Sequence, residues 1–194
     1  MGSSTDLLLE HLGRTVAEGL EPYEQVNRSL IKLNTLTFIP CQSCGRSPAP
    51  RFCFFDGLDE VYEQLEKCDC LLFGTPVYFD SVSAQAKMFI DRCNCFRPPD
   101  YNAEHPEHAF VRRINRRRPG AMILVGGERG WFEGARRVTA GFFKWVEVNN
   151  EGMIQYASPD FNRRGRAADY RETLAAVNKL GQHLATVIRN GLNP

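Results

Sequence analysis

The sequence lacks both a long apolar run and an excess of either charge. Its 194 residues contain 24 lysines and arginines against 23 aspartates and glutamates, a formal net charge of +1. A nearly neutral chain is a poor candidate for broad binding to nucleic acid or to an anionic membrane. No apolar stretch approaches the ~18 residues that a membrane-spanning helix requires, and the start of the chain lacks the apolar core of a signal peptide. We therefore expect a soluble, cytoplasmic protein with no nucleic-acid or membrane partner.

Internal repeats, low-complexity segments and long polar linkers are also absent from the sequence. We therefore expect residues 1–194 to form one domain, long enough to bury most of the surface that its unfolded form exposes. Apolar patterns with helical and strand periods alternate along the chain, which predicts an α/β fold with a mostly parallel sheet covered on both faces. Helices are predicted at residues 5–19, 58–67 (capped by Asp56), 82–93, 131–145 and 169–190, strands at 30–38, 70–73, 121–125 and 153–157, and an irregular excursion at 98–118.

The most informative segment is residues 71–79, LLFGTPVYF. A short apolar run that breaks at Gly-Thr-Pro describes a buried strand ending in a tight loop. Pro76 cannot continue strand pairing, so we expect the backbone N–H groups of Val77, Tyr78 and Phe79 to be released from the ladder. Freed donors beside two aromatic rings, at the sheet edge where open α/β folds bind ligands, suit a planar ligand rich in acceptors. The isoalloxazine ring of a flavin has that shape.

Residues 73–92 resemble the flavin-contacting loop and following helix of the NADPH-dependent FMN reductase family. The family's loop reads Gly-Ser/Thr-Pro-Val-Tyr-Phe-x-Ser-Val-Ser-Ala-x-x-Lys-x-Phe-x-Asp-Arg, which this chain follows almost residue by residue. The resemblance implies a flavodoxin-like, three-layer, doubly wound parallel sheet. It also implies NAD(P)H as electron donor, a small-molecule acceptor such as FMN or a quinone, and a homodimer or homotetramer. The residues that the resemblance assigns to FMN in this loop are Thr75, Pro76, Val77, Tyr78 and Phe79.

The start of the chain departs from that family. The numbered sequence begins at a helix start, and the family's first strand with its Gly-Ser-Pro-Arg turn has no counterpart in it. Losing a central strand would leave backbone groups unpaired in the middle of the sheet. Three explanations are open: the numbered chain omits upstream residues, the sheet closes with a different pairing, or a partner chain supplies the strand.

Ser3, Ser4 and Thr5 fall where the family's Gly-Asn-Thr ends the phosphate loop. In one interpretation, their hydroxyls and the nearby N–H groups bind the FMN phosphate at the helix N-terminus. In the other, Ser4 is only a helix cap. A Met-Gly-Ser-Ser start is also common in expression tags.

A second loop, residues 126–131 with sequence GGERGW, follows the apolar run at 121–125. Glycines directly after a buried strand let backbone approach a ligand, and both loops fall at the same edge of a parallel sheet. The family has Gly-Gly-x-x-Gly-Gly here, lining the other side of the flavin, and this chain places Trp131 at the last glycine. The resemblance therefore implies flavin contacts at Gly126, Gly127, Glu128 and Gly130.

Seven cysteines in an expected cytoplasmic protein suggest metal or redox chemistry before structural disulfides. Cys41, Cys44 and Cys53 resemble the closely spaced cysteines of the related iron-sulfur flavoproteins, but Ser47 stands at the expected third position. A cubane cluster normally takes four thiolates. Our order is unmetallated thiols first, an iron-sulfur cluster completed by another ligand second, and zinc third.

Two polar clusters suggest other ligands. The basic run at residues 112–118 is short, lacks aromatics and belongs to a nearly neutral chain, so we interpret it as a solvated face, with dinucleotide binding as a lesser alternative. In residues 105–108, HPEH, Pro106 breaks the spacing that would aim the imidazoles and the carboxylate at one metal ion. We interpret that segment as a loop.

These observations predict an FMN-dependent NAD(P)H oxidoreductase of the flavin/quinone reductase type. Hydride transfer itself demands no acid-base side chain, so no catalytic residue is assigned. Two alternatives stay open: an electron carrier or redox sensor like the iron-sulfur flavoproteins, and a flavodoxin-like interaction protein that has lost FMN.

Overall fold

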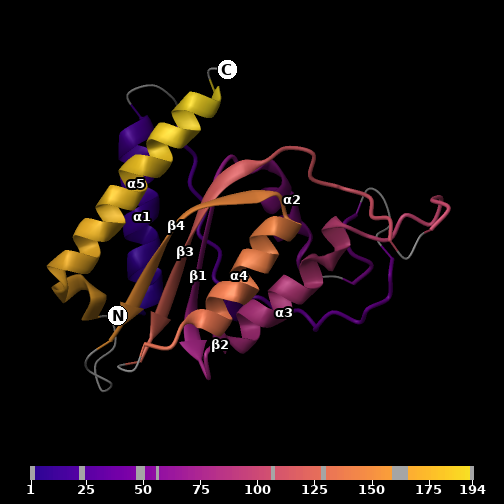
Figure 1. Ribbon diagram of the computed structural model, residues 1–194, viewed down its shortest axis with the longest axis horizontal. Helices are drawn as coiled ribbons and strands as arrows, with labels where there is room; N and C mark the ends of the chain where they lie inside the picture. Colours follow the sequence, from indigo (N-terminus) through magenta and orange to yellow (C-terminus); the bar gives the residue numbers. More distant parts are fainter. Residues whose placement is uncertain are drawn as a thin grey trace.

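The computed structural model describes residues 3–21, 25–46, 51–55, 57–105, 108–127, 130–158 and 166–192. They form a four-stranded sheet between two layers of helices (Figure 1). The strand order is β2-β1-β3-β4, in which β1 (Leu71–Tyr78), β3 (Arg118–Gly126) and β4 (Val148–Ala157) are parallel and the short β2 (Ser81–Val82) is antiparallel to β1. The predicted α/β fold with a mostly parallel sheet is therefore confirmed.

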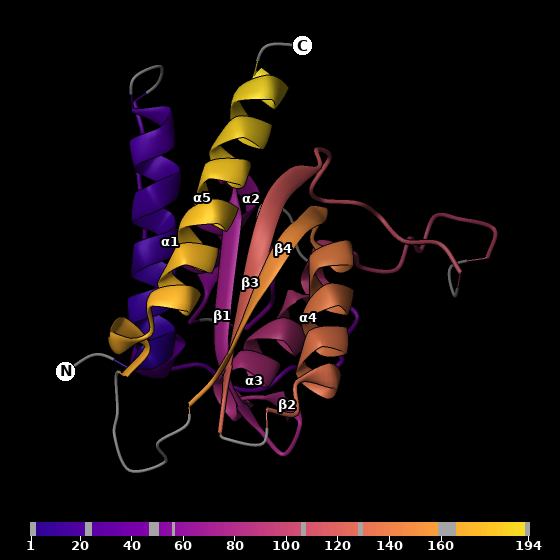
Figure 2. The same cartoon turned by 60° about the vertical axis from the view of Figure 1, so that its left-hand side comes forward.

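Helices cover both faces of the sheet, as Figure 2 shows. One layer holds α1 (Ser4–Leu20) and α5 (Arg171–Leu192), and the other holds α3 (Ala84–Arg92) and α4 (Glu133–Trp145), with α2 (Asp59–Lys67) preceding β1. All five predicted helices are confirmed, with each end within two residues of its predicted place. Asp56, the predicted cap of α2, lies outside the described residues. Short 3-10 segments add η1 (Leu33–Thr35), η2 (Cys93–Phe96) and η3 (Arg166–Asp169).

The central strand β3 is buried on both faces, which explains its continuous apolar run. Ala121 and Ile123 pack with the α1–α5 layer, whereas Met122 and Leu124 pack with the α3–α4 layer. All four are fully buried. Among the described residues, no helix combines the length and the apolar character needed to cross a membrane.

The strand predicted at residues 30–38 is wrong. This segment is a coil that contains η1, because the Thr35 hydroxyl and N–H both donate to the Lys32 carbonyl, at 2.8 and 3.0 Å, and close a turn. The alternating apolar residues that suggested a strand are still half-buried against the α3–α4 side of the core. They are Ile31, Leu33, Leu36 and Phe38.

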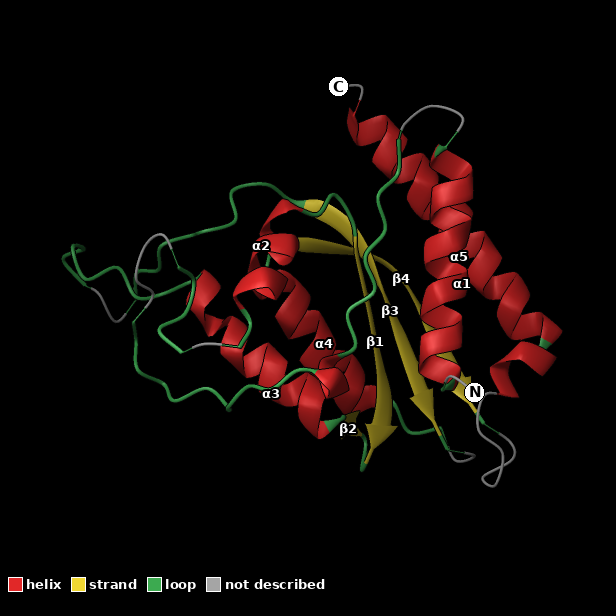
Figure 3. Cartoon of the chain, turned by 180° about the vertical axis from the view of Figure 1, so that it is seen from behind, coloured by secondary structure: helices red, strands yellow, loops and turns green. Residues whose placement is uncertain are grey.

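This coil lies along the edge of β1 opposite β3 (Figure 3). Lys32 pairs with Asp6 of α1 at 3.1 Å, and the Ser29 hydroxyl donates to Gln64 of α2 at 2.7 Å. Within the described residues, no strand pairs with residues 71–76 on that edge. The expectation that the described sheet lacks the family's first strand is thus confirmed, and a coil contacts both flanking helix layers there.

The irregular excursion predicted at residues 98–118 is confirmed over the described residues of 98–117, whereas Arg118 is the first residue of β3. Together with Arg97, this segment projects from the body (Figure 1). An isolated bridge joins Pro99 to Phe110, and Arg113 fixes the base of the segment by donating to the Arg51 carbonyl at 2.8 Å. His105 and His108 lie in this segment, as the loop interpretation requires, and Pro106 and Glu107 lie outside the described residues.

Candidate functional site

The strand that carries the first predicted loop does not end at Pro76. Strand β1 continues to Tyr78, and a two-residue turn leads into β2, with Val77 opposite Val82 and Tyr78 opposite Ser81. The parallel register with β3 stops at Pro76 and Val125. The predicted release of the Val77 and Tyr78 backbone is therefore confirmed toward β3 and wrong toward β2. Proline is tolerated at position 76 because, among the described residues, β2 pairs only with Val77 and Tyr78 and no strand pairs with Pro76 on that edge.

The turn between the two strands is left-handed at both central positions. Phe79 has φ of 51° and Asp80 has φ of 56°, as a type I′ hairpin turn requires. Asparagine, aspartate and glycine tolerate this conformation, but phenylalanine does so only at a cost. The Phe79 ring is nevertheless fully exposed, and Tyr78 is 60% exposed. Two aromatic side chains therefore stand in solvent at the end of β1.

Thr75 holds the two ends of this hairpin together by hydrogen bonds. Its side chain is fully buried, its hydroxyl donates to the Pro76 carbonyl at 2.8 Å, and it accepts the Ser83 N–H at 3.0 Å. Ser83 in turn caps α3 by accepting the Ala86 N–H at 3.3 Å. The Thr75 hydroxyl is thus engaged within the protein, and it fixes where the hairpin leaves the sheet.

The glycines of the second loop differ in what surrounds them. A Cβ at Gly126 would lie 2.8 Å from the Phe132 ring, and one at Gly130 would lie 3.3 Å from the same ring, so both positions make room for Phe132. Gly130 also has φ of 57°. A Cβ at Gly127 would meet nothing within 4 Å. Of the loop glycines, Gly127 is the one that borders open space, and Glu128 lies outside the described residues.

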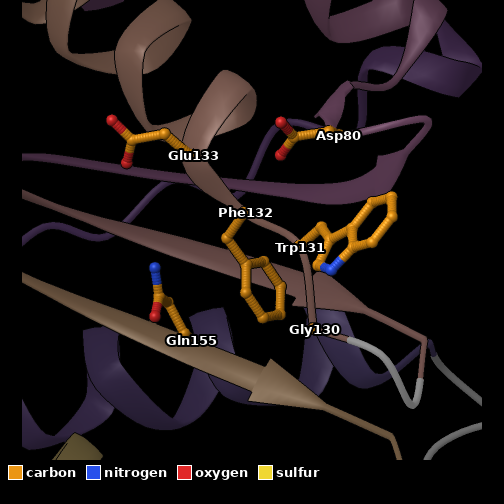
Figure 4. A pocket seen from close by; sticks show the side chains of 6 residues that line it. All are labelled: Asp80, Gly130, Trp131, Phe132, Glu133 and Gln155. Atoms are coloured by element: carbon orange, nitrogen blue, oxygen red, sulfur yellow. The ribbon is translucent and has the colours of Figure 1, made fainter.

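A pocket of about 350 Å³ lies between the hairpin, the start of α4 and the end of β4 (Figure 4). On one side of the pocket Asp80 joins the hairpin to α4, because its Oδ1 accepts the Gly134 N–H at 3.0 Å. Trp131 is 72% exposed, whereas Phe132 is buried. The lining residues are Asp80, Gly130, Trp131, Phe132, Glu133 and Gln155.

The pKa of Glu133 in this lining is lowered to about 2, because Arg136 and Arg137 donate hydrogen bonds to its carboxylate. Glu133 is therefore an ionised group whose charge is already paired. No local pattern pointed to Asp80 or Gln155 as pocket residues, since each lines the pocket only through the pairing of distant segments.

The start of α1 lies at the same end of the sheet as both loops (Figure 3). Ser3 is its N-cap, since the Ser3 hydroxyl accepts the Asp6 N–H at 3.1 Å, and the Ser4 hydroxyl accepts the Ala167 N–H at 3.4 Å. The capping role that one interpretation gave to Ser4 thus falls to Ser3. Thr5 is buried against Gly74 of β1. The first N–H groups of a helix have no intrahelical acceptor. The backbone N–H groups of Ser4 and Thr5 are therefore suitable hydrogen-bond donors for an anion.

The cysteines of the suspected cluster do not lie in one kind of environment. Cys44 is exposed and Cys41 half-buried, whereas Cys53 is buried in the core cluster that also holds Cys93 and Cys95. Burial raises the pKa of Cys95 to about 12, with a further contribution from Cys53. No three metal-binding side chains come together in the part of the chain that the structure describes. Ser47 lies outside it.

The basic run is largely structural. Arg116 binds Asp69 at 2.7 Å and the carbonyls of Lys67 and Cys68, and Arg118 donates to the Leu65 carbonyl, so both arginines cap the C-terminus of α2. Arg118 is buried, which makes the solvated-face interpretation wrong at that residue.

The chain is similar to known flavoproteins. An iron-sulfur flavoprotein of Methanocaldococcus jannaschii is 33% identical over 97 residues, which cover 50% of this chain and 47% of that protein. The match thus spans about half the length of that curated relative.

Two solved structures share the fold at low identity. RosB with a bound 8-demethyl-8-formylriboflavin-5'-phosphate has a TM-score of 0.68 at 11% identity. The match covers 98% of this chain and 75% of the RosB chain. A flavodoxin, WrbA-like protein from Agrobacterium tumefaciens has a TM-score of 0.51 at 16% identity, over 94% and 90% of the two chains. The fold is therefore flavodoxin-like.

The family model described as NADPH-dependent FMN reductase matches residues 1–159, which include α1, the hairpin loop, the glycine loop and all four strands. Because this match covers most of the chain, the chain belongs to the NADPH-dependent FMN reductase family.

Proposed function

We propose that this protein is an FMN-dependent NAD(P)H oxidoreductase of the flavin/quinone reductase type, which passes reducing equivalents to a small acceptor. The observation that carries the proposal is the meeting of two loops at the carboxyl ends of β1 and β3. One loop exposes the rings of Tyr78 and Phe79, and the other leaves open space at Gly127. Family membership supports the same assignment.

The ring end of the site fits a flavin in its chemistry. Aromatic side chains that stand in solvent gain stability when a planar ligand covers them. Tyr78, Phe79 and Trp131 are three of the exposed large hydrophobic residues of the described chain, and all three belong to the two loops. The open space at Gly127 lets the backbone approach a flat ring where a side chain would obstruct it.

The phosphate end of the site would be the start of α1. There the backbone N–H groups of Ser4 and Thr5 and the exposed Ser3 would face the FMN phosphate. Asp6 places a carboxylate nearby, but the Lys32 ammonium pairs with it at 3.1 Å and offsets its charge. An anion at this helix end is therefore compatible with the described residues.

Bound FMN would supply the two-electron chemistry, accepting a hydride from NAD(P)H and reducing the acceptor. The contribution of this chain is to hold and orient the ring. Thr75 and Ser83 fix the start of the hairpin through their hydrogen bond. Tyr78 and Phe79 would flank the ring. No described side chain has to exchange a proton for hydride transfer itself, so we assign binding residues and no catalytic residue.

We further propose that residues 1–194 act as one domain, that the protein is cytoplasmic, and that it forms a homodimer or homotetramer. Support for oligomerisation comes from the projecting segment, where Tyr101, Phe110 and Val111 are exposed. Exposed apolar side chains gathered on a projection are typical of a protein contact. Light scattering on the purified protein measures the oligomeric state directly.

An electron carrier or sensor that holds an iron-sulfur cluster is the second candidate. It is favoured by the names of the curated relatives and by the Cys41-x-x-Cys44 spacing, in which Cys44 is exposed. Iron and acid-labile sulfide in stoichiometric amounts, with broad absorption that oxygen destroys, would establish this candidate. Purification without oxygen is required, because a cluster on an exposed loop is easily lost.

The visible spectrum of the purified protein tests the main proposal. We expect flavin bands, or their appearance on loading with FMN, that bleach when NADPH is added. A colourless protein that cannot be loaded would contradict the proposal. The double variant Pro76→Ala, Tyr78→Ala should bind FMN at least tenfold more weakly, whereas Leu30→Ala, which removes an exposed apolar side chain elsewhere, should not. Equal affinity in the double variant and the wild type would remove the hairpin from the site.

A further inference from the structure

The helix α4 begins without a cap of its own. Its N-cap residue is Phe132, whose side chain makes no capping hydrogen bond. The missing acceptor comes from Asp80, which belongs to the β1–β2 hairpin 54 residues earlier in the chain and accepts the Gly134 N–H at 3.0 Å. A carboxylate at a helix N-terminus also interacts favourably with the helix dipole. The hairpin therefore caps a helix that follows the other cofactor loop.

The contact leaves no room for a larger residue at Gly134. A Cβ there would lie 2.1 Å from the Asp80 carbonyl oxygen and 3.2 Å from its Oδ2. Gly134 is thus required by the close approach of the hairpin backbone, and its N–H is aimed at the Asp80 carboxylate. Backbone approach and hydrogen bond together fix the distance between the hairpin and α4.

Asp80 also adopts the left-handed backbone conformation that a tight hairpin turn requires. Its φ of 56° follows that of Phe79, and the second of these two left-handed residues is the one that binds α4. Aspartate tolerates this region better than most residues. Anchoring Asp80 therefore fixes the turn that aims the exposed Phe79 and Tyr78 rings.

We propose that Asp80 is a positioning residue for the flavin: its contact with Gly134 locks the hairpin to α4 and so fixes the gap between the aromatic rings and the Gly127 loop. The inference rests on the proposed FMN site. Asp80 is not a catalytic residue, since its Oδ1 is engaged by the α4 backbone. Its effect on bound FMN passes through the position of Tyr78 and Phe79 on one side and of Gly127, Gly130 and Trp131 on the other.

Three variants of the contact and two control variants separate this role from general stability. Asp80→Ala removes the acceptor, and Asp80→Asn keeps a side-chain oxygen at that place. Gly134→Ala pushes the hairpin away from α4, because the added methyl group would clash with the Asp80 carbonyl oxygen. Gly141→Ala is the matched glycine control, because it lies in the same helix and a Cβ there meets nothing within 4 Å. Asp91→Ala is the matched carboxylate control, because Asp91 pairs with Lys87 on the surface of α3.

The first measurement uses the protein without FMN. Amide hydrogen exchange should accelerate in residues 77–82 and in residues 132–136 together, in both Asp80→Ala and Gly134→Ala. Neither control should change these two segments. Acceleration confined to the segment that carries the substitution would overturn the lock, because it would show that the two loops move independently.

The second measurement titrates FMN into each variant. Asp80→Ala and Gly134→Ala should each weaken FMN binding about tenfold, and Asp80→Asn should recover most of the affinity. The double variant Asp80→Ala, Gly134→Ala should bind FMN no more weakly than Gly134→Ala alone, because both substitutions break the same contact. At saturating FMN, the midpoint potential of the flavin should differ from wild type in Asp80→Ala and return toward it in Asp80→Asn.

Wild-type affinity and potential in Asp80→Ala would overturn the inference while leaving the proposed function in place. Failure of the wild-type chain to bind FMN would overturn the proposed function and, with it, the role of Asp80 toward the flavin. The exchange measurement would then still decide whether the lock exists. The two failures are therefore distinguishable.

Discussion

Arg97 and Glu147 form an ion pair that joins the base of the projecting segment to the turn between α4 and β4. Glu147 is only 6% exposed and has φ of 57°, and Arg97 also donates to the Trp145 and Lys144 carbonyls at 2.9 and 3.0 Å. Arg97 thus caps the C-terminus of α4 and shares the buried carboxylate of Glu147 with Arg112 and Arg117, which approach it to 3.8 and 3.5 Å. The pair lies at the end of the sheet opposite the β1–β2 hairpin and the loop that follows β3.

Glu147→Gln should destabilise the protein by ~2–4 kcal/mol, because it leaves the guanidinium of Arg97 without its buried counter-ion. Urea unfolding at neutral pH measures this difference. Glu63→Gln is the control: Glu63 pairs with Lys67 on the exposed surface of α2, and breaking that pair should cost less than ~1 kcal/mol. Equal losses in the two variants would mean that burial adds nothing to the Arg97–Glu147 pair.

Phe79→Asn should stabilise the protein without ligand and weaken its binding of FMN. Asparagine tolerates the left-handed φ of 51° at this position, and the fully exposed ring contributes no packing that the substitution could remove. We expect a gain of ~0.5–1 kcal/mol in the free energy of unfolding. FMN titration should show a loss of several-fold in affinity, because one flanking ring is gone. A variant that is less stable and binds FMN normally would contradict both parts.

Gly126→Ala and Gly127→Ala should separate packing from ligand approach. A methyl group at Gly126 would meet the buried Phe132 ring, so this variant should lose ~1–3 kcal/mol of stability. A methyl group at Gly127 enters open space, so stability should stay within ~0.5 kcal/mol while FMN affinity falls. Thermal unfolding and FMN titration of both variants measure the two effects. Unchanged FMN affinity in Gly127→Ala would place the ring elsewhere.

Local patterns predicted most of the fold. The apolar run at residues 121–125 predicts β3 because that strand is buried on both faces. The helices are predicted by apolar residues that recur at helical spacing. The strand predicted at residues 30–38 failed because the same alternation serves a half-buried coil, where Thr35 closes a turn on Lys32. Nothing in the local sequence distinguishes the two outcomes without knowing what lies beside β1.

The two loops of the candidate site could be recognised in the sequence, but their arrangement in space could not. Residues 71–79 carry the strand, its proline and its aromatics in one short pattern. The turn itself was missed, since Phe79-Asp80 lacks the Asn-Gly signature of a type I′ hairpin. The contact of Asp80 with Gly134 depends on the pairing of β1 with β3, which no spacing along the chain reveals.

Alkaline pH should weaken the fold through its buried thiols. Burial raises the pKa of Cys95 to about 12 and that of Cys70 to about 12, from an ordinary value of 9.0. Because the folded state prefers the neutral thiol, this contribution is fully present below pH 9 and is lost as the pH rises from about 9 toward 12. The free energy of unfolding should therefore decline over that range, by up to ~1.4 kcal/mol per pH unit for each such thiol.

Urea unfolding between pH 7 and 11, with reductant present, tests this pH dependence. Cys95→Ala should lower stability at pH 7 by leaving a small cavity, and should make the decline above pH 9 shallower, because one titrating group is gone. Cys44→Ala serves as the control, since Cys44 is exposed, and should leave the slope as it is in the wild type. A wild-type slope in Cys95→Ala would show that other groups govern the alkaline decline.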